Sequence, residues 1–142
     1  MRIAGSCHCG NIAFTLDWRP EPDAIPARAC TCSFCARHGA VWTACPGGSL
    51  SIAIADAARV SPYAFGTRTA QFHVCARCGV VPAATSDIDG RRYAVVNVRT
   101  FSDLDPALLR IARVTHTDAD EAARLARRQR SWIADVTGLS AS

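Results

Sequence analysis

The chain contains no lysine, no long hydrophobic run and no low-complexity tract. All 16 basic residues among its 142 are arginines, and against 12 acidic residues they leave a formal net charge of +4. So small a charge on a chain of this size supports solubility and argues only weakly for nucleic-acid binding. The apolar runs are far shorter than the ~20 residues of a membrane-spanning helix. We therefore expect neither a nucleic-acid partner nor a membrane segment.

The amino terminus also lacks the apolar segment of a secretory signal, so we expect a cytoplasmic protein. In that compartment its 8 cysteines would be reduced and would serve as metal ligands rather than form disulfides. A chain of 142 residues is long enough for one domain with its own core, and no linker divides it. We predict one domain over residues 1–142, with a zinc-binding β core at 5–100 and carboxy-terminal helices at 105–137.

Apolar side chains alternate with a period of two over much of the first 100 residues, which predicts a mainly β fold. The prolines at positions 20, 22 and 26 predict a loop over 19–27, because proline cannot donate to a strand ladder. The expected strands are 11–17, 39–44, 49–54, 70–74 and 92–99, with a short edge segment at 80–82 and a turn at 87–90.

The last third of the chain changes character and predicts a helical addition to the β core. Asp105 followed by Pro106 is typical of a helix start and predicts a short helix through Arg113. A longer helix is expected from about Thr117 to Thr137, ended by Gly138. The apolar face of this helix would carry Ala122, Leu125, Ala126, Trp132, Ile133 and Val136. The basic run Arg124, Arg127, Arg128 and Arg130 is interpreted as a solvated face.

Two cysteine pairs have the spacing of metal ligands. Cys7 and Cys9 would point to one face of a strand, and a turn containing Cys75 and Cys78 would fold two sulfurs to a common point. Each pair can supply half of a tetrahedral site. Together the pairs would form a closed four-sulfur zinc site that joins distant strands and stabilises the fold. His8 would point away from its neighbours in an extended segment and is not expected to be a ligand.

A third segment places Cys30, Cys32 and Cys35 within six residues. Three thiolates can hold a second zinc while one tetrahedral position stays vacant, which is typical of a reactive site. Spacing alone leaves other arrangements open. Cys45 could close the second site, although it also suits a small core residue. One alternative partition combines Cys30, Cys32, Cys75 and Cys78.

The three cysteine segments resemble a known family. Residues 5–14 (GSCHCGNIAF), 30–39 (CTCSFCARHG) and 72–79 (FHVCARCG) are similar in order and spacing to the glutathione-dependent formaldehyde-activating enzymes and centromere protein V. The resemblance covers about residues 5–100. Segments 97–99 and 105–106 resemble a branch described only as aldehyde-activating proteins.

This resemblance implies a β-tent fold with two zinc ions and carbon–sulfur lyase chemistry. By position, it assigns Cys30, Cys32 and Cys35 to the catalytic zinc. The implied reaction joins formaldehyde and glutathione into S-(hydroxymethyl)glutathione or releases them from it. His116 and Trp132 resemble a histidine and a tryptophan that lie near the end of the chain in many members of the family. The arginine-rich helix between these two residues departs from the family pattern. The residues assigned to the structural zinc are Cys7, Cys9, Cys75 and Cys78.

The vacant position would suit a thiol substrate, because zinc converts a bound thiol into its thiolate at neutral pH. His38, three residues after Cys35, is the first candidate for moving the proton in catalysis, and His73 is the second. Trp42 is interpreted as a core residue. The alternative function is a non-enzymatic zinc-binding interaction module. Candidate partners for the carboxylates of glutathione are Arg37, Arg77 and Arg99.

Overall fold

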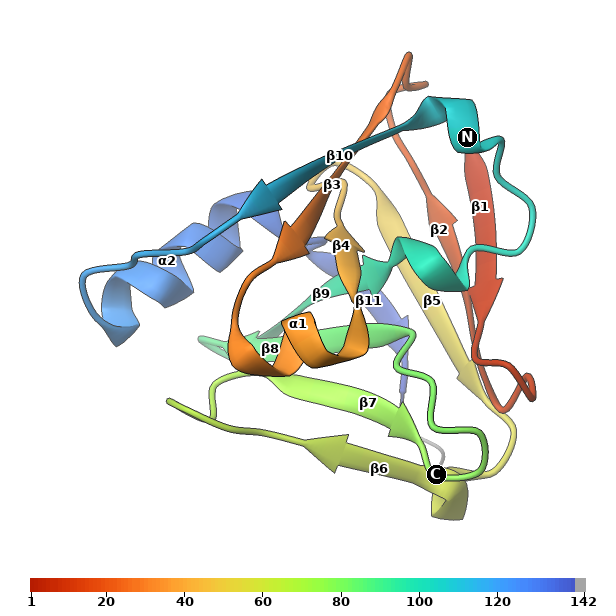
Figure 1. Cartoon of the computed structure of the whole chain (residues 1–142), viewed down its shortest axis with the longest axis horizontal. Coiled ribbons are helices and arrows are strands. Elements are labelled where there is room, and N and C mark those ends of the chain that lie inside the picture. The colour runs from red at the N-terminus through yellow and green to blue at the C-terminus, as the bar shows by residue number, and fades with distance from the viewer. Residues whose placement is uncertain (140–142) are drawn as a thin grey trace.

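The computed structural model describes residues 1–139, which form two β-sheets and two α-helices (Figure 1). The predicted mainly β class is therefore confirmed. No helix within these residues is both long enough and apolar enough to cross a membrane. In chain order, the elements are β1 (Arg2–Ser6), β2 (Ile12–Asp17), β3 (Ile25–Cys30), α1 (Ser33–His38), β4 (Val41–Thr43), β5 (Ser49–Ile54), β6 (Val60–Tyr63), β7 (Gln71–Cys75), β8 (Ala83–Ile88), β9 (Arg91–Asn97), β10 (Leu109–Val114), α2 (Glu121–Ser131) and β11 (Asp135–Gly138), with 3₁₀ turns at Ala57–Arg59, Val98–Thr100 and Pro106–Leu108.

The smaller sheet has the strand order β1-β2-β5-β11. β1, β2 and β5 are antiparallel neighbours, whereas β11 pairs with β5 in parallel. The predicted alternation along β2 is confirmed, because Ile12, Phe14 and Leu16 are all buried. These side chains form one half of the core, and the other half comes from the second sheet.

The larger sheet has the strand order β10-β3-β4-β9-β8-β7-β6, and its central strand β9 is covered on both faces. Along β9, Ala94 and Val96 belong to the core between the two sheets, whereas Tyr93 and Val95 pack on the opposite face. Side chains from α1 and from the end of α2 complete this second apolar cluster. Burial on both faces explains the continuous apolar run 93–96 in the middle of β9. In Figure 1, α2 lies at the opposite side of the molecule from β1 and β2.

Two predictions made from proline are wrong. Residues 107–113 were expected to be helical, but only Pro106–Leu108 makes a single 3₁₀ turn, capped by the Asp105 side chain. The chain then extends as β10, which pairs in parallel with β3 along its whole length. The predicted loop over 19–27 likewise contains the start of β3. Pro26 is tolerated there because β4 pairs only with Arg28 and Ala29, so β3 has a single ladder at Pro26.

The carboxy-terminal helix is shorter than predicted. The Asp120 side chain caps α2 by accepting a hydrogen bond from the Ala123 N–H, and the helix ends at Ser131. Ile133 is fully buried and forms two backbone hydrogen bonds with Ala94 of β9, so sheet pairing replaces helix at this point. The chain beyond it becomes β11 rather than a continuation of the helix.

Strand β8 was also not predicted. It begins after the expected edge segment at 80–82 and runs into the expected turn at 87–90, which the structure confines to Asp89 and Gly90. β8 pairs with β9 along its whole length and with β7 over residues 83–85, so it lies inside the sheet. Its sequence is small and polar, and burial by its neighbours rather than propensity explains the strand.

Candidate metal centres

Seven of the cysteines gather into two clusters, in the partition favoured by spacing and by the family resemblance. Within each cluster, all ligand sulfurs lie within 4.8 Å of one another. All eight cysteines are free. The first cluster consists of Cys7, Cys9, Cys75 and Cys78, and the second consists of Cys30, Cys32 and Cys35.

Two turns build the first cluster. Cys7 and Cys9 were expected on one face of a strand, but they lie in the turn between β1 and β2, where Cys7 N donates to Ile12 O at 2.9 Å. The second turn follows β7, and Gly79 N donates to Cys75 O there at 2.7 Å. Convergence of two turns, rather than strand alternation, therefore brings the four sulfurs together.

The second cluster forms where β3 passes into α1. Cys30 is the last residue of β3, Cys32 caps α1, and Cys35 lies within the helix. The Cys32 sulfur accepts a hydrogen bond from the Cys35 N–H at 3.3 Å, and the Cys35 sulfur accepts one from Trp42 Nε1 at 3.3 Å. Trp42 is buried, as predicted, but it also positions a candidate ligand.

The contact between Cys30 and Cys35 shifts the pKa values of the two thiols in opposite directions. A hydrogen bond from the Cys35 side chain lowers the pKa of Cys30 to about 5. The same contact, together with burial, raises the pKa of Cys35. The thiolate form is therefore favoured at Cys30, and a bound cation would favour deprotonation of the other two thiols.

The donor sets fit zinc. In a tetrahedral site with Zn–S bonds of about 2.3 Å, neighbouring sulfurs lie about 3.8 Å apart. In the first cluster, the Cys7 and Cys9 sulfurs are 3.7 Å apart, and those of Cys9 and Cys75 are 3.5 Å apart. Sets made only of thiolates favour zinc over the hard cations. Both clusters can therefore bind a metal ion, and their chemistry is consistent with zinc.

No fourth protein ligand joins the second cluster within residues 1–139. Cys45 is buried in the inter-sheet core, and its thiol donates to Arg19 O at 3.1 Å. His73 is bound to the Thr85 hydroxyl at 2.8 Å, on a strand next to the first cluster. His8 belongs to neither cluster, as expected.

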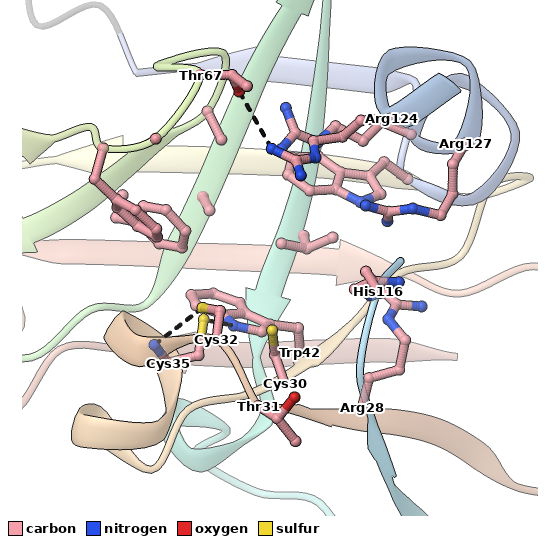
Figure 2. Close-up of a pocket in the computed structure, with 18 of the residues that line it drawn as sticks. Arg28, Cys30, Thr31, Cys32, Cys35, Trp42, Thr67, His116, Arg124 and Arg127 are labelled. Carbon is pink, nitrogen blue, oxygen red and sulfur yellow. Dashed lines mark hydrogen bonds between the residues drawn. The ribbon is translucent and has the colours of Figure 1, made fainter. Parts of the chain in front are cut away.

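A pocket of about 330 Å³ opens beside the second cluster (Figure 2). The three thiols and Trp42 line one side, and Arg124 and Arg127 lie across the cavity from them. His116 and Arg28 stand at one end of the cavity. The rings of Phe65 and Phe72, stacked with centroids 5.5 Å apart, contribute an apolar wall. The site thus combines a sulfur cluster, an aromatic wall and a cationic wall.

The pocket contains His116 but not His38. His38 is exposed on α1 and packs against the ring of Phe34, with centroids 4.4 Å apart. His116 follows β10, whose parallel pairing with β3 brings it to the cluster: Val114 lies opposite Cys30. Burial lowers the pKa of His116, so its imidazole is neutral at pH 7. The sequence contained a signal for His116, since the resemblance already pointed to a terminal histidine.

The arginines at the pocket are not those predicted. The structure places Arg37, Arg77 and Arg99 on the surface, and none of them lines the cavity. The basic run of α2 is not a uniformly solvated face either. Only Arg130 of that run is exposed and remote from the pocket; the pocket arginines are Arg28, Arg124, Arg127 and Arg128. From the sequence alone, the arginines of α2 that face the pocket cannot be told from those that face solvent.

Comparisons with known proteins agree with this geometry. A family model described as glutathione-dependent formaldehyde-activating enzyme matches residues 2–116, which include both cysteine clusters. The crystal structure of a Rhodobacter sphaeroides protein is similar at a TM-score of 0.60 and 29% identity, over 78% of this chain and 99% of that one. A search of curated proteins found no match. With the family model covering most of its length and its cysteines clustered in the family's order, the chain belongs to the glutathione-dependent formaldehyde-activating enzyme family.

Proposed function

We propose that the protein is a zinc-dependent carbon–sulfur lyase that forms or cleaves the adduct of a thiol and an aldehyde. Glutathione and formaldehyde are the substrates that its family implies. The observation that carries this proposal is the second cluster. Cys30, Cys32 and Cys35 face a cavity of about 330 Å³, and no fourth protein ligand among residues 1–139 competes for the remaining position.

A zinc ion on these three cysteines would supply a substrate thiolate at neutral pH. The overall reaction forms one carbon–sulfur bond and moves the thiol proton to the carbonyl oxygen. The electron pair of the carbonyl π bond passes to that oxygen, so neither an oxidant nor a reductant is required. The reverse reaction returns the proton to sulfur and releases the aldehyde.

The protein's own groups hold the cluster and handle the proton. The Trp42 indole N–H and the Cys35 backbone N–H each donate to a cluster sulfur, which fixes the orientation of the thiols. His116 lines the pocket with a neutral imidazole, which can accept the thiol proton and return it to the product oxygen. We therefore assign the proton-transfer role to His116 rather than to His38. The stacked rings of Phe65 and Phe72 give the cavity an apolar wall.

We assign the first cluster to a structural zinc. Cys7 and Cys75 are buried. The cluster brings together the turn that follows β1 in the small sheet and the turn that follows β7 in the large sheet, so a bound zinc ion would cross-link the two sheets. Four thiolates would complete the coordination of this zinc and leave no position for a substrate. The two clusters would thus have different roles with the same metal.

The test measures metal content and thiol binding together in the wild type, in Cys32→Ser and in Cys45→Ser. The wild type should hold two zinc ions per chain and bind glutathione, measured by elemental analysis and calorimetry. Cys32→Ser should lose one zinc ion and glutathione binding. Cys45→Ser is the matched control, because its thiol lies in the core outside both clusters and serine can still donate to Arg19 O.

Two results would contradict the proposal. A single zinc ion in the wild type would show that the second cluster does not bind metal. Two zinc ions without measurable thiol affinity would favour the alternative, a zinc-binding module without catalysis. Exchange between formaldehyde, glutathione and their adduct, followed by NMR, should be accelerated by the wild type and not by Cys32→Ser.

A further inference from the structure

The family model ends at residue 116, yet the segment after it builds one wall of the pocket. The basic side chains that α2 directs to the cavity come from successive turns, together with the ring of Trp132 at the end of the helix. The part of the chain that the family model does not describe therefore shapes the candidate active site.

Arg128 is a buried cation without an acidic partner. It is only 8% exposed, and within residues 1–139 it makes no ion pair. Its Nη1 donates to the hydroxyls of Thr69 and Ser86 at 2.8 and 3.2 Å, and its guanidinium lies over the Trp132 ring at 5.1 Å. Its Nε is buried and has no hydrogen-bond partner in that range. A buried charge of this kind is costly unless an anion compensates it.

The neighbouring arginines add positive charge to the same wall. Among the described residues, Asp118 is the one carboxylate paired with them: Arg127 donates to it through Nε and Nη2, both at 3.0 Å, and Arg124 lies 3.6 Å from it. Arg28, on β3 opposite Trp42, is half-buried and makes no ion pair within the described residues. Four arginines thus line the cavity, and only two of them pair with a carboxylate within residues 1–139. The thiols lie on the far side of the cavity from Arg124 and Arg127 (Figure 2).

We propose that Arg28, Arg127 and Arg128 form a carboxylate subsite that selects thiol substrates bearing an acid group. A carboxylate at this wall would supply the counterion that Arg128 lacks and would accept hydrogen bonds from guanidinium groups that line the cavity. Charge-assisted hydrogen bonds of this type are about twice as strong as neutral ones. The inference relies on the proposed function only for the sulfur end of the substrate, since the anion site depends on the arginines alone.

The test compares two thiols of equal length. Zinc-loaded protein is titrated by calorimetry with 3-mercaptopropionate, which is anionic, and with 3-mercaptopropan-1-ol, which is neutral. We expect the acid to bind roughly 10-fold tighter or more, the effect of one good charge-assisted contact in a shielded pocket. A third probe, 3-(methylthio)propionate, carries the carboxylate without a free thiol and reports the subsite by itself.

The preference for the acid should fall towards unity in Arg28→Gln and in Arg128→Gln. Arg130→Gln is the matched control on α2, because Arg130 is exposed and does not line the pocket. If the role of Arg128 were only structural, through its hydrogen bonds to Thr69 and Ser86, Arg128→Gln would be less stable but would keep the preference for the anionic thiol. If Arg128→Gln does not fold, the less buried Arg28→Gln decides the question.

The outcomes separate this inference from the proposed function. Equal affinity of the wild type for the two thiols would overturn the subsite and leave the thiol chemistry intact. The protein could bind 3-(methylthio)propionate in a way that depends on the arginines, yet bind 3-mercaptopropionate no more tightly. That result would support the subsite and contradict the proposed function. Absence of binding by all three probes would contradict both.

Discussion

Removing the first cysteine cluster should destabilise the protein more than removing the second. The perturbation is a pair of double variants, Cys9→Ser with Cys78→Ser, and Cys30→Ser with Cys32→Ser. Each removes two ligands from one cluster and leaves the other intact. The expected difference arises from the length of chain that each metal closes into a loop.

The magnitude follows from the sequence separations. Cys9 and Cys75, whose sulfurs lie 3.5 Å apart, are separated by 66 residues, whereas Cys30 and Cys35 are five apart. Loop-closure entropy gives about 4 kcal/mol for a cross-link across the longer loop and about 2 kcal/mol across the shorter. The first double variant should therefore be less stable than the second by about 2 kcal/mol, which corresponds to roughly 4–8 °C in Tm for a domain of this size.

The assay is urea unfolding followed by circular dichroism, with zinc per chain measured on the same samples. Each double variant should retain one zinc ion. Equal stability of the two variants, or greater damage from loss of the second cluster, would refute the assignment of the first cluster as the structural cross-link. Cys45→Ser controls for the loss of a buried thiol that binds no metal.

Two further predictions concern the pocket. His116→Gln should slow adduct exchange about 100-fold, which is the usual contribution of a positioned acid–base group. Its zinc content and thiol affinity should stay unchanged. A larger loss of activity in His38→Gln, measured by the same NMR assay, would show that His38 transfers the proton, as the sequence suggested. Hydrogen bonds from Arg127 lower the pKa of the Asp118 carboxyl, so the folded protein holds this proton less readily than the unfolded chain. Its stabilisation is therefore fully present above about pH 4 and is lost as the pH falls through the lower folded pKa. Asp118→Asn should cost about 1 kcal/mol in urea unfolding at pH 7 and progressively less in acid, and a cost that grew as the pH fell would contradict this sign.

The metal clusters were predictable because ligand spacing is local information. Cys30, Cys32 and Cys35 converge within one strand–helix junction, and Cys75 and Cys78 within one turn. The joining of the two distant pairs was inferred from the need for four ligands. How Cys7 and Cys9 converge was not predictable, because a turn and a strand can both bring i and i+2 sulfurs to a metal.

The carboxy-terminal third was the least predictable part. Leu109–Val114 has a helix-start signal before it, but the free edge of β3 provides a ladder of backbone hydrogen bonds that a short isolated helix cannot match. Ile133 leaves the helical pattern for the same reason, because it is fully buried against β9. In both places a distant strand decides the local conformation.

The sequence by itself determined the mainly β class and the family, because these depend on alternation and on cysteine spacing along the chain. It favoured the partition of seven cysteines into two clusters but left other partitions open, and the structure selected among them. Only the tertiary structure decided what faces the three-cysteine cluster. β10 carries His116 to the pocket and α2 carries Arg127 and Arg128, over more than 80 residues from Cys30. Such placement depends on which sheet edge and which helix face find partners, and no local pattern encodes that choice.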